Sequence, residues 1–280
     1  MSPTEITLAE RLGYAPDARL LIVNCDDLGS SHAANLAIAR ALERGVATSA
    51  TLMVPCPWAR EAATMCAGRD VGVHLTLTAE YPGYRWRSLT GGASLHDADG
   101  FLPATAAEVF ADADPADARA ELRAQIDQAR AWGVDVTHLD SHMGTAQFDA
   151  RFFEIYLDLA AAYRLPVRMI SARADARLGF DGRRRATERG ILFTDHLLDS
   201  FPKAARDVLF DRIPRLRPGV AEFFSHPVDD GAELRGYDKE QPDLRASDAA
   251  LFDDPATKRL IEEAGVIPIS YRVLRDLQRA

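Results

Sequence analysis

The segment 20–30, LLIVNCDDLGS, contains the pattern on which the rest of this chain is organised. Its four leading apolar residues predict a buried strand, and the polar residues Asn24, Asp26 and Asp27 follow where that strand would end. Two serines, which are good helix caps, then precede helix-forming residues over 33–44, and a glycine follows the last of them. The segment therefore predicts a strand, a polar turn and a helix in succession.

The same strand–helix alternation continues along the chain. Further apolar runs and helical periodicity predict strands over 48–54, 71–77, 134–139, 167–170, 191–193, 220–224 and 266–269, and helices over 58–67, 116–132, 148–163 and 255–264. Apolar strands separated by helices are typical of parallel sheets with helices on their faces. Seven or eight such strands predict an α/β fold with a parallel (β/α) barrel, either regular or distorted and seven-stranded. An open doubly wound sheet is the alternative.

Length and charge narrow the class of protein. A chain of 280 residues suits one barrel domain spanning 1–280. The formal net charge of −9 disfavours a nucleic-acid partner, because phosphate binding needs a basic face. One basic run, Arg183–Arg185, is interpreted as a solvated loop.

Targeting and redox signals point to the cytoplasm. The N-terminal segment Met1–Leu12 lacks the apolar core of a signal peptide, and no stretch approaches the roughly 18 apolar residues of a membrane helix. The cysteines are odd in number and form no CxxC motif, which favours a reduced setting: Cys25, Cys56 and Cys66. We therefore expect a soluble, cytoplasmic protein with no membrane partner, and a homodimer is left open.

Polar residues gather at the predicted strand ends. The Asp26–Asp27 pair follows the first strand, His74 lies near the end of the third, and His226 follows the strand over 220–224. Taken singly, each has an ordinary structural explanation, such as a helix cap or a core histidine. The carboxyl ends of parallel strands meet at one face, however, and in barrels that face carries the active site.

The segment 138–142, HLDSH, is the most concentrated of these signals. In an extended chain His138, Asp140 and His142 point to one side, which brings two imidazoles and a carboxylate together. Two histidines and a carboxylate are a common zinc ligand set in hydrolases. The same set serves non-haem iron oxygenases. The strand–helix alternation disfavours that second interpretation, because such oxygenases usually use an antiparallel β scaffold.

The motifs, taken in order, resemble those of the YdjC-like carbohydrate deacetylases. The similarity runs from Leu21 to about Leu274, and it is carried by the following segments: Asn24–Gly29, Asn35, Gly45–Ser49, Gly72–Leu75, His138–His142, Ser225–Pro227, and Arg245 with Asp248 and the Asp253-Asp254-Pro255 turn. The resemblance implies a barrel of the glycoside hydrolase/deacetylase type. It also implies one divalent metal ion, Zn²⁺ or Mg²⁺ with Mn²⁺, Co²⁺ or Ni²⁺ as alternatives, and a small-molecule carbohydrate substrate carrying an N-acetyl group.

The resemblance also implies a role for each matching residue. It assigns the metal ligands as Asp27, His74 and His142; the general base as Asp26; the acid or oxyanion partner as His226; a partner that orients Asp26 as Arg245; and groups that support the ligands or contact substrate as His138 and Asp140. Amide hydrolysis needs an activated water, a polarised carbonyl and a proton acceptor. Two adjacent carboxylates that leave one turn in different directions suit that division of labour.

Three positions depart from the family pattern: Leu28 replaces an aromatic residue, Gly144 stands where a further histidine is common, and Val228 follows the His-Pro motif in place of glycine. These changes leave the implied ligands intact and bear on substrate identity. The segment 81–115, rich in Gly, Pro and Asp, is expected to be an inserted lid or substrate loop. Its Tyr84 and Trp86 could stack on a sugar ring or pack within the insertion.

Two other functions fit the same motifs. One is a different metal-dependent barrel hydrolase or isomerase acting on a small polar substrate, and acetate release from N-acetylglucosamine compounds would distinguish it. The other is a catalytically inactive sugar-binding relative, which would bind metal and hydrolyse no acylated amine.

Overall fold

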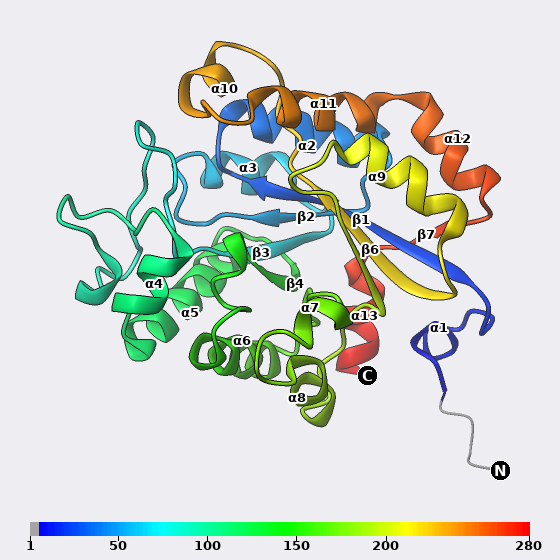
Figure 1. The fold of residues 1–280 in the computed structure, drawn as a ribbon, viewed down its shortest axis with the longest axis horizontal. Helices are drawn as coiled ribbons and strands as arrows, with labels where there is room; N and C mark the ends of the chain where they lie inside the picture. Colours follow the sequence, from blue (N-terminus) through cyan, green and yellow to red (C-terminus); the bar gives the residue numbers. More distant parts are fainter. Residues whose placement is uncertain (1–5) are drawn as a thin grey trace.

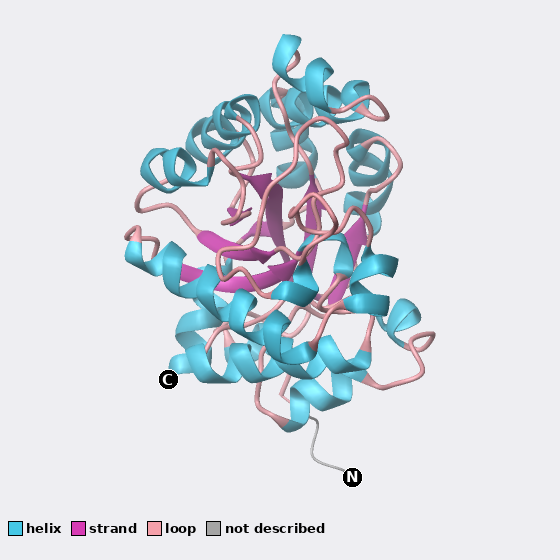
Figure 2. Cartoon of the chain, turned by 90° about the vertical axis from the view of Figure 1, so that its left-hand side faces the viewer, coloured by secondary structure: helices cyan, strands magenta, loops and turns pink. Residues whose placement is uncertain are grey.

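The computed structural model describes residues 6–280. The first five residues of the N-terminal segment Met1–Leu12 lie outside the described part. A curled, wholly parallel sheet forms the centre, with helices around its outside (Figures 1 and 2). Its order is β4-β3-β2-β1-β6-β5, and β7 also pairs with β1. The strands are β1 Arg19–Leu28, β2 Ser49–Leu52, β3 Val71–Leu75, β4 Val136–Ser141, β5 His196–Asp199, β6 Gly219–Ser225 and β7 Ile267–Pro268.

The helices begin and end largely where local sequence signals predict. Before the second helix, the Ser31 side chain accepts a hydrogen bond from the Ala34 N–H, and Gly45 follows its last turn. The α-helices are α1 Leu8–Arg11, α2 His32–Arg44, α3 Ala59–Met65, α4 Ala106–Asp112, α5 Pro115–Ala131, α6 Ala150–Tyr163, α7 Ala172–Asp175, α8 Gly182–Glu188, α9 Ala205–Arg212, α10 Ala232–Tyr237, α11 Pro242–Asp253, α12 Pro255–Glu263 and α13 Tyr271–Arg279. Three 3₁₀ turns are η1 Ala93–Leu95, η2 His142–Gly144 and η3 Ile213–Arg215.

The barrel is closed by irregular chain between β4 and β5. Val167 forms a single parallel bridge with Leu139 of β4, and its N–H donates to the carbonyl of Leu192. The predicted strands 167–170 and 191–193 are therefore not regular, and Pro166 lacks the N–H that a continued ladder would need. The prediction of a parallel, distorted β/α barrel with seven strands is confirmed.

Alternate residues of β1 face two different environments. Leu21 and Val23 pack into the main core under the surrounding helices, whereas Leu20 and Ile22 pack with Tyr271 of α13 at the base of the barrel. This period of two places Asn24 and Asp26 on the interior side, directly above the apolar base. The sequence thus turns from apolar to polar along β1 where the strand reaches the mouth of the barrel.

The basic run Arg183–Arg185 lies in α8, so its interpretation as a solvated loop is wrong. Arg183 donates to the carbonyls of Ile170 and Thr194, and Arg185 pairs with Glu154 at 2.6 Å. Arg183 thus connects α8 to the irregular closing segment, and Arg185 connects it to α6. Across residues 6–280, none of the helices is both long enough and apolar enough to cross a membrane.

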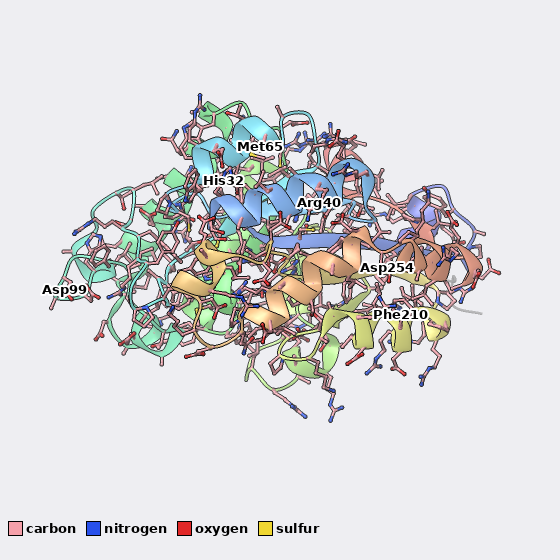
Figure 3. All side chains as sticks on the ribbon, turned by 90° about the horizontal axis from the view of Figure 1, so that it is seen from above. His32, Arg40, Met65, Asp99, Phe210 and Asp254 are labelled. Carbon is pink, nitrogen blue, oxygen red and sulfur yellow. The ribbon has the colours of Figure 1, made fainter. Side chains whose placement is uncertain are left out.

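The insertion over 81–115 leaves the mouth of the barrel at residues 81–82 and returns to it at residues 104–105, before α4. Just before this return, the Pro103 carbonyl accepts a hydrogen bond of 2.7 Å from the N–H of Ala79, which precedes the insertion. Asp99 marks its outer tip, at one end of the molecule (Figure 3). Trp86 is 3% exposed and donates through Nε1 to the Thr78 carbonyl, so it packs within the insertion and is not available to stack on a sugar.

Candidate active site

Asp26 and Asp27 reach the same cavity because β1 is irregular at its end. In a regular strand, neighbouring side chains point to opposite faces. Here the pairing with β2 shifts between Cys25 and Leu28, and Asp27 has a φ of 63° in the left-handed region. This backbone turn directs both carboxylates into the mouth of the barrel.

Asp27 lies between two imidazoles contributed by other strands. Its Oδ1 atom is 3.4 Å from Nε2 of His74 on β3 and 3.3 Å from Nδ1 of His142 in η2. Its Oδ2 atom accepts a hydrogen bond of 2.9 Å from Arg245. Oδ1 is buried and has no hydrogen-bond partner among the described residues. An unpaired buried carboxylate oxygen facing two imidazole nitrogens is the arrangement expected of a cation site.

A carboxylate stands behind each imidazole. Asp140 is the register partner of His74 in the sheet, and its Oδ2 is 2.8 Å from His74 Nδ1. Glu80 places both carboxylate oxygens 3.1 Å from Nε2 of His142. Burial lowers the pKa of each imidazole, but these neighbouring carboxylates and Asp27 outweigh it and raise the pKa to about 9 for His74 and about 10 for His142. The site therefore carries an excess of negative charge that favours a cation.

Asp26 is held by Arg168. The guanidinium donates to both carboxylate oxygens of Asp26, at 2.6 and 2.7 Å, and Asn24 donates to Oδ1 at 2.8 Å. Burial acts to raise the pKa of Asp26, but the Arg168 charge prevails and lowers the pKa to about 2. The same guanidinium also contacts Asp140 at 2.5 Å and Glu222 at 2.8 Å. Arg168 therefore connects Asp26 to Asp140, the carboxylate that supports His74.

The predicted pair between Arg245 and Asp26 is wrong. Arg245 lies on α11 and bridges Asp27 to Asp238, with 2.9 Å contacts to each. The register of β1 explains the difference, because Asp26 faces the barrel interior where Arg168 is buried. Arg245 approaches from the outer rim, on the side to which Asp27 turns.

His226 lies across the cavity from the imidazole pair. It directly follows β6, whose Ser225 is level with Cys25, and its Nε2 is 3.9 Å from Oδ2 of Asp26. Its backbone N–H donates to Asp248. Burial lowers the pKa of the imidazole, which favours the neutral form at pH 7.

His138 lies apart from this group. Its ring stacks on Tyr271 with centroids 3.7 Å apart and planes at 10°, below the cavity that Asp140 lines. Of the two roles expected for His138, supporting the ligands or contacting substrate, the second does not fit a residue that does not line the cavity. His138 and Asp140 share a face as the extended chain predicts, but His138 lies nearer the base of the barrel, while His142 enters the site from the turn after β4.

A cavity of about 730 Å³ opens over these residues. Asp26, Asp27, His74, His142 and His226 line it, together with four residues of the insertion: Tyr81, Pro82, Ala104 and Thr105. Three large apolar side chains at its rim are unusually exposed: Met143 43%, Phe148 45% and Phe201 47%. Cavities of about 300–1,000 Å³ take drug-sized ligands, so there is room for more than one sugar ring.

The backbone and the neighbouring ring of Phe148 explain why residue 144 is a glycine. Its φ of 67° is one that glycine adopts freely, and a Cβ there would lie 2.1 Å from the Phe148 ring. Any longer side chain at this position would therefore displace Phe148 from the rim.

Within residues 6–280, two groups of three could hold a metal ion: Asp27, His74 and His142, and Asp26, His74 and Asp140. In the second group, Arg168 already contacts both carboxylates and supplies the positive charge. In the first group, Arg245 contacts only Oδ2 of Asp27, so no guanidinium occupies the side of Oδ1 that faces the two imidazoles, and this group fits a cation better.

Three site residues were missed by the sequence reasoning: Arg168, Glu222 and Glu80. Arg168 and Glu222 each interrupt an apolar strand-like run, VRMI and VAEFF, with a single charge of opposite sign. Lone opposite charges in buried runs indicate a pair, because an unpaired buried charge is costly. Glu80 follows β3 in an irregular segment, and no sequence signal marks it.

Fold and site together define a parallel β/α-barrel protein with a carboxylate–imidazole centre at its strand ends. The sequence model of the family described as YdjC-like protein matches residues 20–263. The chain belongs to this family, as its motifs predict.

Similar proteins agree with this placement. A Thermus thermophilus protein named carbohydrate deacetylase is 44% identical over 279 residues, covering 96% of this chain and 98% of the relative. One of the same name from Geobacillus stearothermophilus is 31% identical, covering 91% and 97%. A crystal structure from Enterococcus faecalis V583, described in terms of cellobiose-phosphate cleavage, superposes with a TM-score of 0.81 over 92% of this chain and 99% of that one. At 24% sequence identity, this last likeness concerns the fold alone.

Proposed function

We propose that this protein is a metal-dependent hydrolase that removes the acetyl group from an N-acetylated amino sugar or oligosaccharide. The observation that carries the proposal is the division between two adjacent aspartates. Asp27 presents an unpaired oxygen to two imidazoles, whereas Asp26 is held 3.9 Å from His226 by Arg168. Two homologues named carbohydrate deacetylase, which match nearly the full chain, support the substrate class.

Asp27, His74 and His142 would hold the cation. Two imidazole nitrogens and one carboxylate oxygen are a ligand set typical of Zn²⁺ in hydrolases, whereas Mg²⁺ prefers oxygen ligands alone. Zn²⁺ is therefore proposed ahead of Mg²⁺, with the other divalent ions as substitutes.

Asp26 would accept the proton of the attacking water. Its carboxylate is ionised at any physiological pH, but a pKa of about 2 makes it a weak base. A bound divalent cation lowers the pKa of a water to about 7 and polarises a carbonyl oxygen. A weak base is then sufficient, and its fixed orientation matters more than its basicity.

His226 would act as the oxyanion partner. Being neutral, it can donate one N–H to the carbonyl oxygen as negative charge develops there. The water oxygen bonds to the carbonyl carbon, the carbon–nitrogen bond breaks, and the proton held by Asp26 passes to the leaving amine. The products are acetate and the free amino sugar. Arg245, which holds Oδ2 of Asp27, would fix the direction of that carboxylate.

The test measures acetate release from N-acetylglucosamine and its short oligomers. Metal-free protein should be inactive, and Zn²⁺ should restore equimolar acetate and amine. His74→Ala and His142→Ala should lose both metal and activity, and unchanged metal content in both variants would refute the ligand assignment. Metal binding without hydrolysis of any acylated amine would instead favour an inactive sugar-binding relative. Turnover of a different polar substrate would favour another barrel hydrolase or isomerase.

A further inference from the structure

The two imidazoles of the site present different nitrogens to Asp27. His74 directs Nε2 toward Oδ1, whereas His142 directs Nδ1 toward the same atom. Which nitrogen of a histidine can bind a cation depends on the hydrogen bond made by the other, because only the unprotonated nitrogen is a ligand. The carboxylates behind the rings therefore determine which nitrogen of each histidine can bind the metal ion.

The two supporting carboxylates differ in their surroundings. Asp140 is buried, lies in a strand and shares the Arg168 guanidinium, so its charge is balanced inside the barrel. The Glu80 side chain is 21% exposed and faces the cavity, and its ion-pair partner is His142. His142 therefore relies on one partly solvated glutamate for its orientation.

The position of Glu80 is set by the insertion. The residue before it, Ala79, donates its N–H to the carbonyl of Pro103 where the insertion returns to the barrel, and its own carbonyl accepts from Arg85 at 3.1 Å. The residue after it, Tyr81, packs edge-on against Tyr237 with centroids 4.9 Å apart. Contacts on both sides thus fix the backbone from which Glu80 reaches His142.

We propose that Glu80 is a positioning residue that fixes His142 with its proton on Nε2, so that Nδ1 is free to bind the metal ion. The proposal rests on the metal site of the proposed function. It adds a residue that couples the insertion to that site. Carboxylates that support metal-binding histidines typically contribute 10- to 100-fold in metal affinity.

The experiment measures Zn²⁺ affinity of the metal-free full chain by competition with a chromophoric chelator. Glu80→Ala should weaken binding by at least about tenfold. Glu80→Gln, which keeps the shape and one acceptor oxygen, should lose less. Glu240→Gln is the matched control, since it removes one negative charge from the same cavity, and it should stay within about twofold. Wild-type affinity in Glu80→Ala, or an equal loss in Glu240→Gln, would overturn the proposal.

A spectroscopic measurement separates positioning from general electrostatics. In the Zn²⁺-loaded wild type labelled with ¹⁵N-histidine, His142 should show a metal-bound Nδ1 and a protonated Nε2. In Glu80→Ala that signature should broaden or change to Nε2 ligation, while His74 stays unchanged. Binding of His142 through Nε2 in the wild type would overturn the proposal. A wild type that binds Zn²⁺ as described but releases no acetate would refute the proposed function and leave the role of Glu80 standing.

Discussion

The guanidinium of Arg168 donates hydrogen bonds of 2.6 and 2.7 Å to the two carboxylate oxygens of Asp26 inside the barrel. The two residues are 142 positions apart in the chain, and both are almost fully buried. Because the guanidinium also contacts Asp140 and Glu222, it fixes the Asp26 carboxylate relative to the imidazole pair. Arg168 sets the direction of the proposed base.

Arg168→Lys should therefore damage turnover more than binding. Lysine keeps the positive charge but cannot bind both carboxylate oxygens in a fork. We expect kcat to fall about 10- to 100-fold with KM nearly unchanged and the metal retained. Arg168→Met, which leaves buried carboxylates unpaired, should cost about 3–5 kcal/mol in stability. Steady-state kinetics and urea unfolding of the two variants check this, and a wild-type kcat in Arg168→Lys would contradict it.

The sequence predicts which strand ends meet, because apolar runs locate the strands and parallel strands all point the same way. Asp26, Asp27, His74 and His226 therefore come together as expected. What the sequence does not reveal is side-chain direction at an irregular position. The bulge at Asp27, with its positive φ, decides which aspartate faces the imidazoles, and no local pattern marks it.

Pairings between distant segments are only partly visible in the sequence. A lone charge in each of two apolar runs indicates that Arg168 and Glu222 need partners, but they are 54 positions apart and the sequence does not show that Arg168 also contacts Asp26 and Asp140. The segment 138–142 shows the limit of periodicity. Its period of two correctly places His138 and Asp140 on one face of β4, which ends at Ser141. His138 comes two residues earlier in the strand, so it lies nearer the base of the barrel, against Tyr271, and does not reach the site.

His138→Phe tests that correction. A phenyl ring can keep the stack on Tyr271, and Thr137, which contacts His138 Nδ1, still has Asp70 as a hydrogen-bond partner. We expect unchanged Zn²⁺ content and acetate release, with a change in stability below about 1.5 kcal/mol. Elemental analysis beside His74→Ala, which should lose its metal, makes the comparison. Loss of Zn²⁺ from His138→Phe would return His138 to the metal site.

Asp248 should give the fold a measurable pH dependence. Its carboxylate accepts from the N–H groups of Ala205 and His226, but burial prevails and raises the pKa to about 6. The unfolded value is about 3.9, so the folded chain binds this proton more tightly. The resulting stabilisation is fully present below about pH 4 and is lost as the pH rises through about 6, by up to roughly 3 kcal/mol.

Comparison with Asp248→Asn isolates this effect, because the variant keeps the other titrating groups and its amide cost does not depend on pH. Urea unfolding of both metal-free proteins from pH 4 to 7.5 gives the difference in stability. That difference should move against the wild type as the pH rises between 4 and 6 and stay flat above 7. A constant difference across the range would show that Asp248 does not titrate there.

The adjacent aspartates should fail in different ways when each is neutralised. Asp26→Asn keeps the shape of the side chain but removes the proton acceptor, and loss of a general base typically costs about 10²–10⁴ in rate. The metal should remain, because both Asp26 oxygens accept hydrogen bonds from Arg168 and Asp26 is not among the proposed ligands. Asp27→Asn should instead weaken Zn²⁺ binding first, since its Oδ1 lies 3.3–3.4 Å from both imidazoles.

Excess Zn²⁺ distinguishes the two losses. It should partly restore acetate release in Asp27→Asn, where occupancy limits activity, and leave Asp26→Asn unchanged, where the site is already filled. Metal content and acetate release measured side by side, at low and high Zn²⁺, give four values that only one assignment of roles can satisfy. If Asp26→Asn loses its metal while Asp27→Asn retains it, the roles are reversed. The positive φ at Asp27 would then serve Arg245 and the rim of the barrel, with the ligand site one residue earlier.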